Sequence, residues 1–405
     1  MYNNDGLPDG TVATNSKDKA QLLATLFAGK MEVDDPERSP PLLEQQCRET
    51  VTKVEVTQGL VERLLQGLDV QKASVWKEAR VVPVHKRSSR SDPKNYRPLL
   101  SVVGKVFERV VADVVCRHLQ DNYLLSDQQF GFRPGRSTSD LLMLLTGGWQ
   151  DALDGGLDSV VVALDIAGTF DRVWHGGLLE KLRAKGIQGD LLQLLGDYLQ
   201  GRTLQVFVNG QASESLPVRA SVPQGSVLGP VLWNIYVDDF LRQLPAVSAY
   251  ADDCTLSCTY PRHESVRAAE EINQQLGVIQ EWGARWQVTF APEKTQAMVV
   301  SRSPAAEPAV EGGLRFGGLP LELQESVKIL RVEVDQGLRF DRPVKHIALK
   351  ASHRVSSLRR VANLLDRRGR LLLYKAQIRP YLDDGRCDWW KQQVPQPILK
   401  LPSTR

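Results

Sequence analysis

The stretch Val247–Leu256 reads Val-Ser-Ala-Tyr-Ala-Asp-Asp-Cys-Thr-Leu and carries two adjacent carboxylates. Residues that favour β-structure lie on both sides of Asp252 and Asp253, so the pattern predicts a hairpin with the acids at its tip. Neighbouring carboxylates repel each other and are costly to desolvate. Their position therefore indicates a bound cation and a polyanionic substrate. A solvated turn is the commoner role of a lone Asp-Asp pair, and that alternative stays open here.

A third carboxylate occupies a similar setting upstream. Ser159–Leu164 is a short, β-branched apolar run, typical of a strand buried on both faces, and it ends at Asp165. If the two strands lie side by side, Asp165 meets Asp252 and Asp253. Such a cluster suits two Mg²⁺ ions, or Mn²⁺ as a substitute, held by carboxylates and substrate phosphates.

Three motifs in this order resemble the palm of a reverse transcriptase, in particular that of a non-LTR (LINE-type) retrotransposon. They are Asp165–His175, Val222–Pro230 and Tyr250–Asp253. The resemblance implies an α+β fold: a right-hand polymerase with fingers, a split βαβ (ferredoxin-like) palm and a helical thumb. It also implies an RNA-directed DNA polymerase that extends a DNA primer with dNTPs on an RNA template by two-metal nucleotidyl transfer.

The resemblance assigns catalytic roles to four residues. Asp165 and Asp252 are expected to be the main metal ligands, and Asp253 ranks lower because adjacent side chains on a strand point to opposite faces. Lys294 lies in the matching stretch Val288–Thr295. It is expected to protonate the leaving pyrophosphate, and an ordinary surface lysine is the alternative.

Five further residues match positions that bind the incoming nucleotide in the family. Lys86 and Arg97 are expected to grip the triphosphate, whereas Gln224 and Gly225 are expected to contact the base and sugar. Phe170 is expected to clash with a 2'-hydroxyl and so to select deoxynucleotides. A core phenylalanine is the alternative.

The distribution of charge supports a domain plan. Lys and Arg outnumber acids by ten to three between residues 72 and 109, and by twelve to two between 339 and 379, which suits phosphate binding. We expect an N-terminal pre-polymerase helical segment at 1–72, a reverse transcriptase domain of fingers and palm at 73–335, a basic helical thumb at 336–390 and a disordered tail at 391–405.

Local signals predict one hairpin turn and the start of one helix. Asn209-Gly210 is a strong hairpin signal. Ser226 is expected to be the N-cap of the helix that follows it, with Pro230 in or near the first turn.

The sequence departs from the family in several places, of which three bear most on function. Ser221 and Arg331 stand where the family has glycine, and a block of several tens of residues is missing between Lys72 and Trp76. The gap predicts a decayed element or a mis-assembled gene. Two alternatives therefore remain: a catalytically inactive nucleic-acid-binding remnant, or a maturase-like intron splicing factor, although the extra RNA-binding domain expected of a maturase is not seen.

The remaining composition bears on compartment and partners. Five scattered cysteines in 405 residues, a net charge of +3 and no signal or membrane-spanning run indicate an intracellular protein of the nucleus or cytoplasm, not a secreted one. Cys254, Cys258 and His263 lack a fourth ligand at zinc-finger spacing. No endonuclease precedes the polymerase motifs, so that function is expected from another chain.

Overall fold

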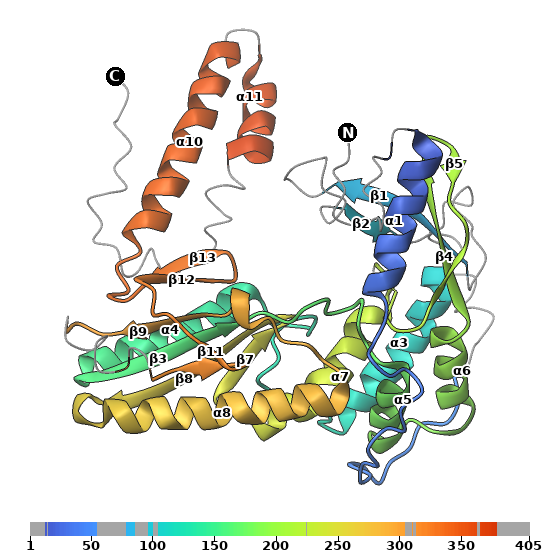
Figure 1. Ribbon diagram of the computed structural model, residues 1–405. Helices are drawn as coiled ribbons and strands as arrows, with labels where there is room; N and C mark the ends of the chain where they lie inside the picture. Colours follow the sequence, from blue (N-terminus) through green and yellow to red (C-terminus); the bar gives the residue numbers. More distant parts are fainter. Residues whose placement is uncertain are drawn as a thin grey trace. The chain divides into compact units, whose positions relative to one another are not determined.

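The computed structural model describes residues 13, 15–54, 78–85, 96–99, 104–223, 225–303, 310, 313–362 and 365–378. The missing block at residues 72–76, the predicted boundary at 72 and the predicted tail at 391–405 lie outside this part. The chain divides into two compact units (Figure 1). Unit 1 consists of Met1–Phe132, Ile166–Pro245 and Val278–Ala291, and unit 2 of Arg133–Asp165, Ala246–Gly277 and Pro292–Arg405.

Unit 2 is built on a four-stranded antiparallel sheet, in the order β7-β8-β3-β9 (Figure 1). The strands are β3 (Leu157–Leu164), β7 (Val247–Tyr250), β8 (Asp253–Pro261) and β9 (Gln296–Val300). β3 is central, and Val160, Val161 and Val162 are all fully buried, so the prediction of a strand covered on both faces is confirmed. The sheet therefore provides the rigid support for the acids at its edge.

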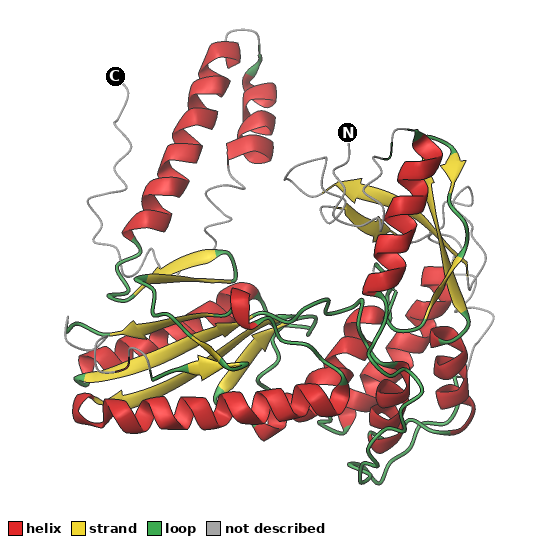
Figure 2. Cartoon of the chain, in the orientation of Figure 1, coloured by secondary structure: helices red, strands yellow, loops and turns green. Residues whose placement is uncertain are grey.

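Two long helices, α4 and α8, contribute to unit 2. α4 (Thr138–Asp154) starts at a capping box, in which Ser137 and Asp140 exchange side-chain and backbone hydrogen bonds, and it packs on β3 and β7. α8 (Ser265–Trp286) follows the short helix η3 (Arg262–Glu264), and its residues up to Gly277 belong to this unit. Figure 2 shows α8 as a long uninterrupted helix.

The C-terminal part of unit 2 contains short strands and then basic helices. The short elements are η4 (Pro292–Lys294), β10 (Arg315–Phe316), β11 (Leu319–Pro320), β12 (Ser326–Ile329) and β13 (Val332–Asp335). α10 (Asp341–Val361), α11 (Arg367–Leu373) and η6 (Tyr374–Ile378) follow. The β12–β13 hairpin packs on β3 and β9 through β12, and α10 contacts η6. The predicted basic segment is thus helical where it is described.

Unit 1 contains a second sheet, in which β1 pairs with β2 and β4, and β4 also pairs with β5 and β6. Its strands are β1 (Glu78–His85), β2 (Tyr96–Leu99), β4 (Arg202–Val208), β5 (Gln211–Ala212) and β6 (Leu216–Val218). Its helices are α1 (Ser16–Lys30), α3 (Gly104–Asp121), α5 (His175–Ala184), α6 (Gly189–Leu199) and α7 (Gly229–Gln243). Asn209 and Gly210 both have positive φ, 49° and 80°, between β4 and β5, so the predicted turn is confirmed.

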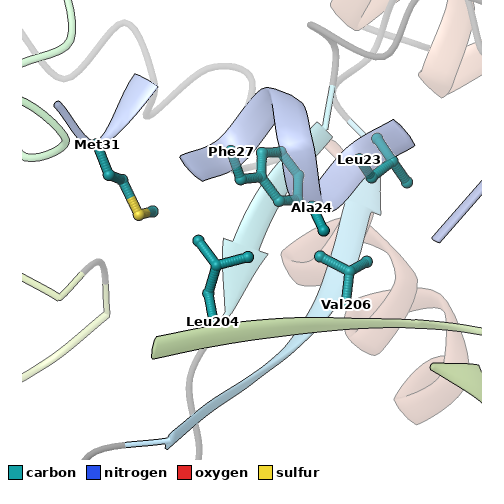
Figure 3. Close-up of a cluster of buried hydrophobic side chains, with 6 residues drawn as sticks. All are labelled: Leu23, Ala24, Phe27, Met31, Leu204 and Val206. Carbon is teal, nitrogen blue, oxygen red and sulfur yellow. The ribbon is translucent and has the colours of Figure 1, made fainter. Parts of the chain in front are cut away.

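Helix α1 covers β4. The helix is capped by Asn15, whose side chain accepts a hydrogen bond from the backbone of Asp18 at 2.8 Å. Its apolar face buries Leu23, Ala24, Phe27 and the following Met31 against Leu204 and Val206 (Figure 3). The N-terminal helix is therefore an integral layer of unit 1.

Helix α7 begins later than the sequence predicted. Ser226 was expected to be its N-cap, but the helix starts at Gly229 and the N-cap is Leu228, which makes no side-chain cap bond. The reason is a turn before the helix, closed by a hydrogen bond from the Ser226 backbone to the Pro223 carbonyl. The Ser226 hydroxyl still accepts a bond from the Gly229 N–H at 2.8 Å, and Pro230 lies in the first turn as expected.

In the ranges described, no helix has the length and apolarity needed to cross a membrane.

The packing of α1 can be tested with Phe27→Ala. Phe27 is 1% exposed, so removing its ring should lower the free energy of unfolding by about 3–5 kcal/mol, measured by urea denaturation. Leu42→Ala is the control, because Leu42 is 88% exposed and its removal should change stability by about 0.5 kcal/mol or less. Equal stability of the two variants would contradict the packing of α1 on β4.

Candidate active site

The register of β3 with β8 brings the three predicted carboxylates to one end of the unit 2 sheet. Leu164 lies opposite Cys254, so Asp165 leaves β3 next to the point where β8 begins at Asp253. On the other side Asp253 pairs with Tyr250, which makes Asp252 part of the tight β7–β8 turn. The expectation that the two acid-bearing strands are neighbours is thus confirmed.

The electrostatics of the cluster are those of crowded like charges. Loss of hydration, followed by the charges of Asp252 and Asp165, raises the pKa of the Asp253 carboxyl above its ordinary value. Arg331, in the turn between β12 and β13, acts in the opposite direction on this pKa. Asp253 was ranked below the other two acids as a metal ligand, yet both of their charges raise its pKa.

Lys294 joins the same cluster. It ends η4, immediately before β9, and its Nζ donates a hydrogen bond to Asp165 Oδ2 at 3.2 Å. The side chains of Lys294 and Asp165 are 62% and 46% exposed. Water therefore screens the ion pair, and either side chain can change its partner. An ammonium in this position can move between a carboxylate and a substrate phosphate.

The chemistry of the three carboxylates suits a bound divalent cation. Across the described ranges, no three His, Cys, Asp or Glu side chains are arranged as a ready-made metal cage. Mg²⁺ usually takes only one or two protein carboxylates and completes its shell with substrate phosphates and water. The exposed side chains of Asp252 and Asp253 and the raised pKa of Asp253 fit such an open site.

Phe170 lies in unit 1, close to the loop that follows Val222. Its carbonyl accepts a hydrogen bond from the Val222 N–H at 2.9 Å, and its half-buried ring lies 6.0 Å from that of Trp233. A Cβ added at Gly229 would come within 3.7 Å of the Phe170 ring. Gly225 has a φ of 85°, which favours glycine. The ring predicted to select the sugar therefore adjoins the loop predicted to bind the nucleotide.

The other predicted nucleotide contacts cannot be placed. Lys86 and Gln224 lie outside the described residues. Arg97 is described only through its backbone in β2, where it lies opposite Val84 of β1. Their roles stay predictions.

Both positions where glycine was expected retain a glycine-like backbone. Ser221 has a φ of 105° and Arg331 a φ of 69°. Ser221 is held there from both sides, because its N–H donates to the Val173 carbonyl at 3.0 Å and its carbonyl lies 2.8 Å from His175 Nε2. The strained conformation persists because the surrounding structure fixes it.

Two residues that the structure brings to these sites had no predicted role. The charge of Arg331 acts on the pKa of Asp253, and the ring of Phe132 contacts that of Phe170. The replacement of glycine by arginine was a usable signal for Arg331. An exposed aromatic residue in a loop rich in glycine and proline was a weaker signal for Phe132.

Replacing Ser221 with glycine should relieve backbone strain. We expect Ser221→Gly to raise the free energy of unfolding by about 1 kcal/mol, because glycine adopts positive φ without a steric cost. Ser221→Ala keeps the Cβ and should bring no gain. Urea denaturation of both variants measures the difference, and a gain in the alanine variant would argue against strain as the cause.

Comparison with known proteins agrees with this geometry. A family profile described as reverse transcriptase (RNA-dependent DNA polymerase) matches residues 84–334. The chain is 31% identical over 307 residues to the probable RNA-directed DNA polymerase from transposon BS of Drosophila melanogaster, covering 71% of this chain and 33% of that protein. It is 30% identical over 329 residues to the probable RNA-directed DNA polymerase from transposon X-element of the same species, covering 78% and 35%.

Similarity extends to solved structures at low identity. The telomerase from Candida tropicalis, solved in complex with a TWJ fragment of telomeric RNA, matches with a TM-score of 0.47 and 10% identity, covering 83% of this chain and 57% of that one. The chain spans about a third of the length of the curated relatives named above. Since the family profile covers more than half of its 405 residues, the chain belongs to the reverse transcriptase (RNA-dependent DNA polymerase) family.

Proposed function

We propose that this chain is the polymerase part of a non-LTR retrotransposon protein and that it copies RNA into DNA. The observation that carries the proposal is the meeting of Asp165, Asp252 and Asp253 at one end of a sheet, beside Lys294. Membership of the reverse transcriptase family supports the reaction class. The relatives are described as probable RNA-directed DNA polymerases from transposons, which supports an RNA template and a DNA product.

The carboxylates bind and orient the reacting groups. Polymerases depend on divalent cations, and here Asp165 and Asp252 would hold two Mg²⁺ ions, or Mn²⁺ in their place, with Asp253 in support. When bound, the ions supply Lewis-acid stabilisation of the attacking and leaving oxygens. The primer 3'-hydroxyl loses its proton to water, and its oxygen forms a bond to the α-phosphorus of the dNTP as the bond from that phosphorus to pyrophosphate breaks. Lys294 gives its proton to the leaving pyrophosphate oxygen.

The remaining assigned residues bind the incoming dNTP. Lys86 and Arg97 would hold the triphosphate through charge-assisted hydrogen bonds. Gln224 and Gly225 would contact the base and sugar. Phe170 would exclude a ribonucleotide by steric contact with its 2'-hydroxyl, which the position of its ring beside the Val222–Gly229 loop supports.

The basic charges of α10 support binding of nucleic-acid partners. Exposed basic residues of α10, among them Lys345, Lys350 and Arg354, suit the phosphates of the template and primer duplex. The four cysteines in the described ranges are free thiols, which suits a nuclear or cytoplasmic location.

A second candidate is a nucleic-acid-binding remnant without catalysis. The observation that favours it is the positive φ of Ser221 and Arg331, since two strained replacements of glycine are expected in a decaying copy. This candidate predicts RNA binding that weakens steeply with salt but no nucleotide incorporation.

Asp252→Ala tests the carboxylate site. We expect it to abolish primer extension on an RNA template with Mg²⁺ while RNA affinity and thermal stability stay close to those of the parent. The physical reason is that it removes one charge from a crowded exposed cluster, without opening a cavity. Incorporation is measured on gels and RNA affinity by fluorescence anisotropy.

Asp113→Ala is the matched control, because Asp113 is an exposed aspartate on α3, outside the cluster. It should extend the primer like the parent. Extension by Asp252→Ala at the parent's rate would contradict the assignment. A folded parent that binds template but never extends would favour the inactive remnant.

Lys294→Gln tests the proton donor. We expect the single-turnover rate of incorporation to fall about 10²–10⁴-fold, since a general acid contributes about that much, with little change in dNTP affinity. This fall in rate should be smaller with a dNTP analogue whose leaving group needs less protonation than pyrophosphate. Lys17→Gln, at an exposed position on α1, is the control. Equal rates for both variants would make Lys294 an ordinary surface lysine.

A further inference from the structure

Phe132 is an exposed aromatic residue on a strained backbone. Its side chain is 45% exposed and its φ is 59°, in the left-handed region that bulky residues rarely adopt. Because the ring is only partly buried, burial of the ring does not explain why this backbone conformation is maintained. The conformation must instead be imposed by the loop that carries it.

That loop is fastened to helix α7 on the N-terminal side of Phe132. Gly131, next to Phe132, donates its N–H to Gln129 Oε1 at 2.7 Å and accepts a bond from Asn234 Nδ2 at 3.0 Å. The side chains of Gln129 and Asn234 are both buried. The backbone that precedes the Phe132 ring is therefore held by two buried amides.

A buried ion cluster anchors the start of the same loop. Asp238 of α7 accepts bonds from the Ser126 N–H at 2.5 Å and from Lys185 Nζ at 2.6 Å. Arg242 Nε approaches the same carboxylate at 2.8 Å. Since Asp238 and Lys185 are almost fully buried, this end of the loop is fixed.

The exposed ring of Phe132 contacts the half-buried ring of Phe170. The two ring centroids are 5.9 Å apart at an angle of 65°, an edge-to-face geometry. The centroid of the Phe170 ring also lies 6.0 Å from that of Trp233, which is 1% exposed. Phe170 therefore contacts one buried ring and one exposed ring.

We infer that Phe132 is a positioning residue for Phe170 and thereby sets how strictly the polymerase excludes ribonucleotides. The inference rests on the proposed function. A ring rejects a 2'-hydroxyl only if it cannot swing aside, and Phe132 adds a second ring contact to the one that Phe170 makes with Trp233. Edge-to-face pairs contribute enough that losing one changes a conformational equilibrium by about 2- to 12-fold.

The test compares incorporation of a dNTP and the matching rNTP by the purified chain on an RNA template. Phe132→Ala should lower the ratio of the two kcat/KM values by about 2- to 12-fold, mainly through faster ribonucleotide incorporation. Phe132→Tyr keeps the ring and should restore the ratio. In a Phe170→Ala background, the Phe132→Ala change should have no further effect on the ratio.

Tyr123→Ala is the matched control. Tyr123 is also an exposed aromatic with positive φ in unit 1, 87% exposed with a φ of 54°, and its backbone bonds to Gln120 and Arg242. It should leave the ratio unchanged. An unchanged ratio in Phe132→Ala, with a changed one in Phe170→Ala, would overturn the inference. Weaker template binding without a change in ratio would do the same and would make Phe132 a template contact.

A second measurement tests the ring contact without catalysis. In a double-mutant cycle on urea unfolding, Phe132→Ala and Phe170→Ala should be coupled by about 2- to 12-fold in the unfolding equilibrium constant, whereas Tyr123→Ala and Phe170→Ala should be independent. Absence of coupling overturns the inference even if the chain is inactive. Coupling in a chain that extends no primer would instead count against the proposed function alone.

Discussion

The antiparallel register between β3 and β8 is the constraint on which the candidate active site depends. With Leu164 opposite Cys254, the end of one strand and the start of the next deliver Asp165 and Asp253 to the same place. A slip of one residue would turn every side chain of β3 to the other face. The complete burial of Val160–Val162 opposes such a slip, because the slip would place residues of different size or polarity, such as Ser159 or Ala163, in close-packed positions. Core packing thus fixes the distance between charges that repel each other.

Repulsion among these acids is tolerated because the cluster lies at the sheet's end, where water and cations reach it. Lys294 offsets one carboxylate at 3.2 Å, and the charge of Arg331 acts on Asp253. Both basic residues come from segments that follow the palm hairpin in the chain. The second half of unit 2 therefore completes the electrostatics of a site whose acids come from the first.

Strained backbone recurs beside the residues given functional roles. Ser221 precedes the loop that faces Phe170, Arg331 lies near Asp253, and Phe132 contacts Phe170, and all three have positive φ. In unit 1 the strain is sustained by buried hydrogen bonds, from His175 to the Ser221 carbonyl and from Asn234 to Gly131. Such bonds keep a ring or a loop in place at a cost in stability.

The sequence by itself determined the local features: the buried β-strand before Asp165, the turn at Asn209-Gly210 and the hairpin that carries the Asp-Asp pair. These depend on side-chain periodicity and on backbone preferences within a few residues, which a sequence records directly. Only the tertiary structure decided the start of α7 beyond Ser226, the packing of α1 on β4 and the pairing of Phe132 with Phe170. These features join segments far apart in the chain, and an apolar residue carries no mark of which distant partner will cover it.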